Sequence, residues 1–276
     1  MPALNEEENV ETAMRSTLSA FEKYGISGEI LVVNDGSTDR TREIVERMCA
    51  VTQFVRLISH DTPKGIGYSF WDGVKKAEGD VVVLFPADNE IDPDDMLQYF
   101  WLMGKVDMLV PFFHNTEVRN RGRRIISSLY RLAVNMSFGT NLNYTNGSVF
   151  YRRCILDHIE LNSTGFFYQV ELLVKLIRKG YLFAEVPSYL GVRIGGKAKA
   201  ITLKSFLQVV KGYFRLIFEI HILKIEGKKK NYFDLSSNSA TFHRANSFQR
   251  KFEGLKQTVV RPKVNEPAHG VEPKLQ

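Results

Sequence analysis

Short apolar runs alternate with amphipathic segments along roughly the first 110 residues of the chain. The apolar runs predict buried strands, and they lie at 29–34, 54–59, 80–85 and 107–111. Segments with helical spacing of apolar positions follow Glu6, span 39–50 and 64–77, and begin again at Pro93. Such alternation is typical of an α/β fold, and it predicts a mostly parallel, doubly wound sheet flanked by helices.

The start of the chain predicts an incomplete sheet. Pro2-Ala3-Leu4-Asn5-Glu6 has the character of a loop that follows a strand, yet only Met1 precedes it. A parallel strand that is buried on both faces is costly to lose. We therefore expect that the first strand is missing from this sequence, and that an apolar strand of about five or six residues precedes it in the natural protein.

Farther along the chain, a helix predicted near residues 124–136 has two distinct sides. Its apolar side carries Ile125, Ile126, Leu129, Leu132 and Met136, and its polar stripe carries Arg124, Ser128, Arg131 and Asn135. A longer helix is predicted at 203–223. It is apolar except for one line formed by Lys204, Gln208, Lys211, Arg215 and Glu219.

The charges of the 203–223 helix make it a poor membrane-spanning segment. We interpret it as a helix that lies in a membrane interface, with burial against the domain as the alternative. From Gly227 the composition is rich in Lys, Ser and Asn and has little periodicity, which predicts disorder. The chain thus divides into a domain at 1–200, an amphipathic helix at 201–226 and a disordered basic tail at 227–276.

Charge and cysteine content narrow the class of protein. The formal net charge of +6 fits nucleic acid, an anionic membrane surface or a phosphorylated substrate. Nucleic acid is disfavoured because the basic groups lack interleaved aromatic residues for base stacking. Two cysteines, Cys49 and Cys154, form neither a disulfide framework nor a metal cluster and indicate a reducing compartment. The acidic start does not resemble a secretory signal.

Two of the predicted strands end in a carboxylate. The run Ile30–Val33 leads into Asn34-Asp35-Gly36-Ser37-Thr38-Asp39, and the run Val81–Phe85 leads into Pro86-Ala87-Asp88-Asn89-Glu90. Open α/β sheets bind their ligands at the carboxyl ends of the strands. Two acids delivered to one edge therefore predict a site for a nucleotide and a metal ion.

Four motifs together resemble family 2 glycosyltransferases, and within them the branch of dolichyl-phosphate mannosyltransferases and polyprenyl-phosphate glycosyltransferases. The motifs are Pro2-Ala3-Leu4-Asn5-Glu6-Glu7, Asn34-Asp35-Gly36-Ser37-Thr38-Asp39, Lys64-Gly65-Ile66-Gly67 and Ala87-Asp88-Asn89-Glu90. The resemblance implies a GT-A fold over about residues 1–200. It also implies a nucleotide-sugar site formed by Pro2, Ala3, Leu4, Glu6, Asp35, Lys64, Ala87 and Asp88.

Asp35 and Glu6 each have a structural alternative. A carboxylate at a strand end can hold a base or a ribose, but Asp, Ser and Thr also cap helices. We assign the capping role to Ser37 or Thr38 and the ligand role to Asp35. Glu6 is equally compatible with a plain acid in the first turn of a helix.

The resemblance also implies a divalent cation, Mg²⁺ or Mn²⁺, held by Asp88 and Glu90. A hard cation takes oxygen ligands and neutralises a diphosphate leaving group. The branch has Asp-Ala-Asp here, whereas this chain has Pro86-Ala87-Asp88, so the first acid is absent. The alternative for Glu90 and Asp92 is a solvated loop before a helix.

Basic residues are expected to hold the acceptor. Arg193-Ile194-Gly195-Gly196-Lys197-Ala198-Lys199 resembles an Arg-x-x-Gly-x-Ser-Lys motif of the branch, and Arg123-Arg124 matches its acceptor-phosphate arginine. The resemblance therefore implies Asp88, Arg124, Arg193 and Lys199 as the catalytic set. A solvated face or attraction to anionic lipid is the alternative for the basic clusters. Two further arginines of the branch are absent from Val110-Pro111-Phe112-Phe113 and Thr145-Asn146-Gly147-Ser148-Val149.

A catalytic base has one candidate in the second half of the chain. Glu171 could serve an acceptor, although it could equally be a surface acid, and a phosphate acceptor needs no base. His60, His114 and His158 show no ligand spacing, and we assign them no role.

Together these features predict an inverting glycosyltransferase that moves a sugar from a nucleotide-diphosphate sugar to a polyprenyl phosphate. We expect it to be cytoplasmic, on the cytoplasmic face of a membrane. One alternative is a transferase that acts on a saccharide or other soluble acceptor in cell-surface polysaccharide synthesis. The other is a nucleotide-sugar-binding protein with weakened catalysis.

Overall fold

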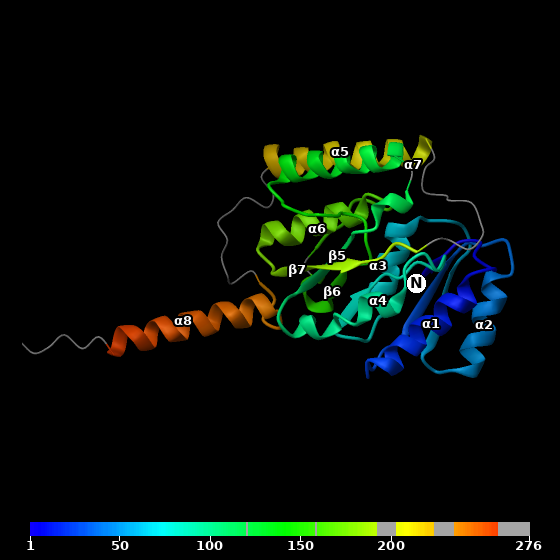
Figure 1. Ribbon diagram of the computed structural model, residues 1–276, viewed down its shortest axis with the longest axis horizontal. Helices are drawn as coiled ribbons and strands as arrows, with labels where there is room; N and C mark the ends of the chain where they lie inside the picture. Colours follow the sequence, from blue (N-terminus) through cyan, green and yellow to red (C-terminus); the bar gives the residue numbers. More distant parts are fainter. Residues whose placement is uncertain (120, 158, 192–202, 224–234, 259–276) are drawn as a thin grey trace, which may run out of the picture.

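The computed structural model describes residues 1–119, 121–157, 159–191, 203–223 and 235–258 (Figure 1). Its first sheet has the order β1-β2-β3, and all three strands are parallel. These strands are β1 (Pro2–Ala3), β2 (Ile30–Asp35) and β3 (Val55–His60). The helices that accompany them are α1 (Val10–Lys23), α2 (Thr41–Val51) and α3 (Ile66–Lys76). All six residues of β2 are buried, as expected for a central parallel strand.

The second sheet has the order β4-β6-β5-β7. Its strands are β4 (Val81–Val83), β5 (Met108–Phe113), β6 (Phe150–Arg152) and β7 (Phe183–Ser188). Short helices α4 (Pro93–Leu97) and η1 (Phe100–Gly104) join β4 to β5. The α/β fold with a parallel sheet flanked by helices is confirmed, but β6 runs antiparallel to β4 and β5. Three residues are too short to show the alternation that would reveal such a strand in the sequence.

At the start of the chain, Pro2 and Ala3 form the short strand β1 beside β2. Pro2 pairs with Val33 and Ala3 pairs with Asn34. Next to this short strand, a cavity of about 290 Å³ lies between the two sheets, and its lining includes residues of β2 and β4. The segment that we interpreted as a loop therefore begins as a sheet strand, and Leu4 marks the start of the loop.

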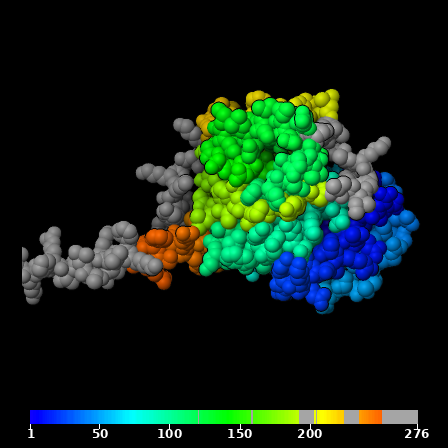
Figure 2. Space-filling model, viewed as in Figure 1, coloured from blue at the N-terminus to red at the C-terminus, as the bar shows by residue number. Residues whose placement is uncertain are grey.

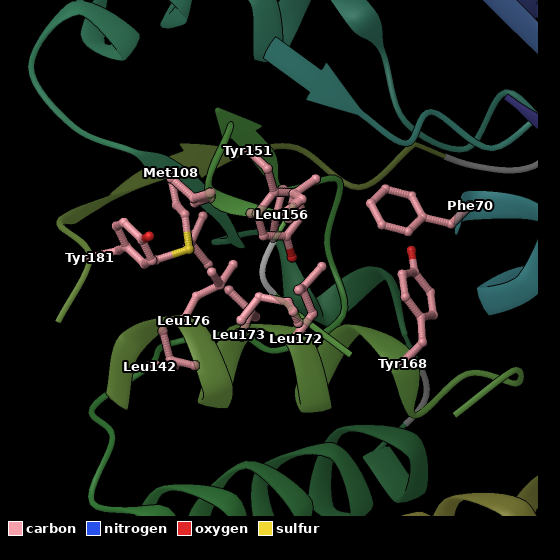
Figure 3. Close-up of a cluster of buried hydrophobic side chains, with 14 residues drawn as sticks. Phe70, Met108, Leu142, Tyr151, Leu156, Tyr168, Leu172, Leu173, Leu176 and Tyr181 are labelled. Atoms are coloured by element: carbon pink, nitrogen blue, oxygen red, sulfur yellow. The ribbon is translucent and has the colours of Figure 1, made fainter. Parts of the chain in front are cut away.

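The main apolar core lies between the second sheet and α6 (Tyr168–Lys179). Leu172, Leu173 and Leu176 of this helix point toward Tyr151 and Met108 of the strands (Figure 3). Most of these side chains are fully buried. The helix therefore covers one face of the sheet and anchors the loop that precedes it.

Outside α6 lies a layer formed by α5 (Arg121–Phe138) and α7 (Leu203–Ile217), which continues into a π-helical turn, η4 (Phe218–Ile222). Figures 1 and 2 show both helices at one end of the molecule, α5 in green and α7 in yellow. One cluster joins all three helices, and it includes Val134, Phe138, Val170, Val174, Leu216 and Ile220. The 203–223 segment thus packs on the domain with one side, as the alternative interpretation expected.

The tail differs in part from the predicted disorder. Residues Ala240–Thr258 form α8, which extends away from the body of the molecule (Figure 1). The buried carboxylate of Asp107 accepts hydrogen bonds from the amides of Ala240 and Thr241 and from the Thr241 hydroxyl. A carboxylate satisfies the free N–H groups of a helix start, so the tertiary contact stabilises a helix that its weak periodicity does not predict.

No helix in these described stretches is both long and apolar enough to cross a membrane.

Candidate functional site

The polar residues predicted at the strand ends come together at one edge of the molecule. Ala3 and Asn34 are register partners, and Asp35 is paired in the same way with His60 of β3. The amide of Ala87 lies 3.3 Å from the carbonyl oxygen of Pro2. The loops after β1, β2 and β3 and the 87–90 segment after β4 therefore surround one site.

Asp35 holds the loop that carries Lys64. Its carboxylate accepts hydrogen bonds from the amides of Lys64 and Gly65, each at 2.9 Å, and Oδ1 lies 2.8 Å from His60 Nδ1. Burial raises the pKa of a carboxyl, but these hydrogen bonds outweigh it and hold the pKa of Asp35 below its usual value. Asp35 is therefore an ionised anchor for the 64–67 loop, a role that the sequence did not reveal.

His60 is a site residue that we had assigned no role. Its ring joins two carboxylates, because Nε2 lies 3.1 Å from Asp72 Oδ2 of α3 while Nδ1 faces Asp35. Both His60 and Asp35 are buried. The spacing of residues along the chain does not predict this arrangement. The signal that could have indicated it is that Asp35 and His60 each stand at the end of a strand, and these two strands are adjacent.

Two glycines allow the loops to approach closely. Gly36 has φ +72°, and a Cβ there would lie 2.7 Å from the backbone nitrogen of Pro63. Gly65 has φ +101°, and its Cβ would lie 2.8 Å from the carbonyl oxygen of Thr164. Both positions need a left-handed backbone and have no room for a side chain, so glycine is required at each.

The loop after β1 is held by the loop after β2. The amide of Asn5 donates to Ser37 Oγ at 2.9 Å, and the amide of Glu6 donates to Thr41 Oγ1 at 2.8 Å. The capping roles assigned to Ser37 and Thr38 are wrong, because α2 begins after Arg40 and Ser37 instead holds Asn5. Glu6 precedes α1 and accepts from the side chain of Asn9, so it is not an acid of the first helical turn.

Asp88 and Glu90 share a tight turn. Oδ1 of Asp88 accepts a hydrogen bond from the Glu90 amide at 3.1 Å, and Asn89 between them has φ +57°. Among the residues that the structure describes, no group of three or more His, Cys, Asp or Glu side chains could hold a metal ion. The predicted donor set therefore consists of the carboxylates of Asp88 and Glu90 alone, two residues apart in the chain. It fits a hard cation only where donor phosphate oxygens and water complete the shell.

The structure describes only one of the three basic residues in the predicted catalytic set. Arg124 is exposed on α5, in the outer helical layer. Arg193 and Lys199 lie outside the described residues. The last described residue before them, Gly191, donates its amide to the carbonyl oxygen of Glu90 at 3.0 Å. Lys64 places Nζ 4.7 Å from the centroid of the Tyr68 ring.

Glu171 is neither an exposed acid nor a candidate base. Its side chain is only 2% exposed, and it accepts hydrogen bonds from Lys175 Nζ at 2.8 Å and from the amides of Asn162 and Ser163. Burial raises the pKa of the carboxyl, but these partners outweigh it and hold the pKa of Glu171 below its usual value. A buried, ionised and fully hydrogen-bonded carboxylate cannot accept a proton from an acceptor at this edge.

Proteins of known sequence resemble this chain over much of its length. It is 26% identical over 226 residues to dolichol-phosphate mannosyltransferase of Pyrococcus furiosus, which covers 79% of this chain and 62% of that protein. It is 29% identical over 160 residues to undecaprenyl-phosphate 4-deoxy-4-formamido-L-arabinose transferase of Pseudomonas syringae, covering 57% of this chain and 47% of that protein. The chain therefore spans less than two thirds of the length of these relatives.

Solved structures show the same fold. Glucosyl-3-phosphoglycerate synthase of Mycobacterium tuberculosis in complex with phosphoglyceric acid aligns with a TM-score of 0.59 at 20% identity, over 79% of this chain and 77% of that one. Its complex with Mn²⁺, uridine diphosphate and phosphoglyceric acid aligns with a TM-score of 0.58 at 23% identity, over 78% and 76% of the two chains.

The family model described as glycosyl transferase family 2 matches residues 1–159, which include the loops of Asp35 and Asp88. Because this match covers more than half of the 276 residues, the chain belongs to glycosyl transferase family 2.

Proposed function

We propose that the protein transfers a sugar from a nucleoside-diphosphate sugar to a polyprenyl phosphate at a membrane surface. In this reaction an oxygen of the acceptor phosphate forms a bond to the anomeric carbon of the sugar. The bond from that carbon to the diphosphate breaks, and its electron pair leaves with the nucleoside diphosphate. A single displacement of this kind inverts the anomeric configuration.

The donor half of the proposal is supported by the edge that carries Asp35 and Asp88. Asp35 fixes the 64–67 loop through two backbone amides, and loops at strand ends are where α/β sheets bind nucleotides. Pro2, Ala3, Leu4, Glu6 and Ala87 adjoin this edge. The mycobacterial synthase, which shares this fold, was crystallised with uridine diphosphate and either Mn²⁺ or Mg²⁺.

Asp88, with Glu90, would hold a divalent cation against the donor diphosphate. Mg²⁺ or Mn²⁺ bound there supplies positive charge that stabilises the leaving diphosphate. The hydrogen bond from the Glu90 amide orients the Asp88 carboxylate. Since the acceptor phosphate is itself a nucleophile, the reaction needs no carboxylate base, which agrees with the burial of Glu171.

The acceptor half depends on one observation above all, the apolar surface of the outer helical layer. Large apolar side chains on both helices, on η4 and at the residue after η4 are exposed, namely Ile125, Ile126, Leu129, Leu132, Met136, Leu203, Phe206, Leu207, Phe214, Phe218, Ile222 and Leu223. Exposed apolar surface beyond a few hundred Å² marks a docking site for protein or membrane. Arginines at the start of α5, including Arg123 and Arg124, favour the anionic surface of a membrane as the occupant.

Arg124, Arg193 and Lys199 would hold the acceptor phosphate. Gly191, the last described residue before Arg193, donates its amide to the carbonyl oxygen of Glu90, and this hydrogen bond supports the assignment. Guanidinium groups form strong charge-assisted bonds to phosphate. Both curated relatives described above are named for a polyprenyl-type phosphate, dolichol phosphate or undecaprenyl phosphate. This acceptor would place the protein on the cytoplasmic face of a membrane.

Radiolabelled nucleotide sugars test this function directly. The full chain is incubated with each member of a panel, with and without polyprenyl phosphate and Mn²⁺, and counts that enter the organic phase are measured. We expect transfer with one donor, dependent on both the lipid and the ion. Efficient transfer to a water-soluble saccharide without lipid would support the soluble-acceptor alternative, and donor binding without any turnover would support a binding protein.

A further inference from the structure

A network of buried and partly buried charged residues connects the outer helical layer to the loop that Asp35 anchors. We propose that Arg215 of α7 and Glu171 of α6 are positioning residues for the 64–67 loop, and that they act through the backbone of residues 162–164. This inference rests on the proposed function, because it assigns the donor as the ligand whose binding these residues support.

The first link is between the 64–67 loop and residues 163–164. The carbonyl oxygen of Thr164 accepts a hydrogen bond from the Gly67 amide at 2.8 Å. A Cβ on Gly67 would lie 2.8 Å from the carbonyl oxygen of Ser163, and one on Gly65 would meet Thr164 as closely. The two backbones therefore pack directly on each other, so a shift of 163–164 would displace the loop.

The second link holds residues 162–164 from the side of α6. Glu171 accepts from the amide of Asn162 at 2.9 Å and from that of Ser163 at 3.0 Å. Lys175 neutralises this carboxylate and also donates to the carbonyl oxygen of Glu160 at 2.7 Å. A buried ion pair keeps a fixed geometry only when its remaining hydrogen bonds are made, and here the 160–163 backbone makes them.

The third link comes from α7. Arg215 Nη2 donates to Ser163 Oγ at 3.0 Å and lies 3.8 Å from Glu171 Oε2. Glu219, one turn later, accepts from the side chain of Asn162 at 2.9 Å. Arg215 and Glu219 belong to the polar line that we had assigned to a membrane interface, yet they face the domain. Their role is to hold residues 162–163.

Matched charge variants on α7 test the proposal. Arg215→Met and Lys211→Met each remove one positive charge from the same helix, and Lys211 is exposed one turn earlier. Calorimetry of the full chain with uridine diphosphate and with guanosine diphosphate, each with Mn²⁺, measures donor-site affinity. We expect Arg215→Met to weaken binding about threefold to tenfold, which corresponds to the net contribution of one ordinary hydrogen bond, because Arg215 acts on the donor site only through residues 162–164. Lys211→Met should leave binding unchanged.

Steady-state kinetics distinguish a role in positioning the 64–67 loop from a general loss of structure. Arg215→Met should raise the donor KM by the same factor while kcat stays nearly constant, and Arg215→Lys should restore part of the loss. Ser163→Ala removes the same hydrogen bond from the other side. If the two residues act through each other, the double variant is no weaker than the worse single variant. Ser163→Ala also provides the test if Arg215→Met does not fold.

Equal affinities for the wild-type protein and the Arg215 and Ser163 variants would overturn the inference and leave the proposed function intact. Additive losses in the double variant would also overturn it. If neither nucleoside diphosphate binds the wild-type protein, the donor half of the proposed function fails, and the inference fails with it.

Discussion

The first sheet and the outer helical layer differ in how far the protein itself buries their side chains. Every residue of β2 is buried, and the polar groups at its end are hydrogen-bonded within the protein. In α5, by contrast, only Val134 and Phe138 of 18 residues are buried, and large apolar side chains are exposed. Within the described residues, the first sheet satisfies its own polar groups. The outer helical layer instead exposes apolar surface of the kind that marks a docking site.

The largest effect is expected at the polar edge. Asp88→Ala should reduce turnover by at least about a hundredfold, because Asp88 is the proposed ligand of a cation that would stabilise the leaving diphosphate. The melting temperature should change little. Transfer assays with and without excess chelator measure the effect, and Glu22→Ala is the matched control because it removes an exposed carboxylate of α1, outside the loops that surround the site. Near-normal turnover of folded Asp88→Ala would remove the ion from the proposal.

Substitutions in the outer helical layer should reduce membrane binding. Phe214→Asp with Phe218→Asp should weaken binding to anionic liposomes by about a hundredfold or more, because each buried Phe contributes about 1.5–3 kcal/mol. Nucleotide binding should persist. Sedimentation with vesicles measures the change. Val51→Asp with Trp101→Asp also replaces two exposed apolar residues, but outside the layer, and should leave vesicle binding unaltered. Equal sedimentation of both double variants would exclude this layer as the membrane contact.

A smaller loss of donor affinity is expected from Asp35. Asp35→Ala should weaken nucleoside-diphosphate binding by roughly 1.5–3 kcal/mol, the range for a hydrogen bond to a charged group. The cause is either a lost contact to the nucleoside or release of the Lys64 and Gly65 amides. Calorimetry measures the affinity. Unchanged affinity would reduce Asp35 to a purely structural anchor.

The smallest effect concerns acid stability. The pKa of Glu171 is lower in the folded protein than its unfolded value of about 4.3. Its contribution to the free energy of unfolding is therefore present above about pH 4.3 and is lost as the pH falls through the pKa of the folded protein. Thermal melts between about pH 6 and 3 should show a flatter acid limb for Glu171→Gln than for the wild-type protein. Glu46→Gln, at an exposed site, should follow the wild-type curve. Parallel curves for Glu171→Gln would contradict the assigned ion pair.

Some features of the site can be predicted from the sequence because they depend only on residues close together in the chain. The apolar run before Asp35 marks a strand, and a carboxylate after it lies at a strand end wherever the strand packs. Asp88 likewise follows a strand, but β4 belongs to the second sheet, and the contact between Ala87 and Pro2 brings its segment to the loops of the first sheet. The role of His60 is not predictable from the sequence because its partners, Asp35 and Asp72, are 25 and 12 residues away. The sheet register brings Asp35 beside it, and the packing of α3 brings Asp72.

The sequence by itself determined the α/β fold, the loops at the strand ends, membership of the family and the amphipathic character of the outer helices. Only the tertiary structure decided which side of each helix is covered. Periodicity defines a polar line on α7, but it cannot show that Arg215 and Glu219 turn inward to residues 162–163 while Phe214 and Phe218 stay exposed. Glu171 is likewise a buried anchor and not a catalytic base. The burial and the hydrogen-bond partners of its carboxylate depend on contacts between distant segments, which the sequence alone does not show.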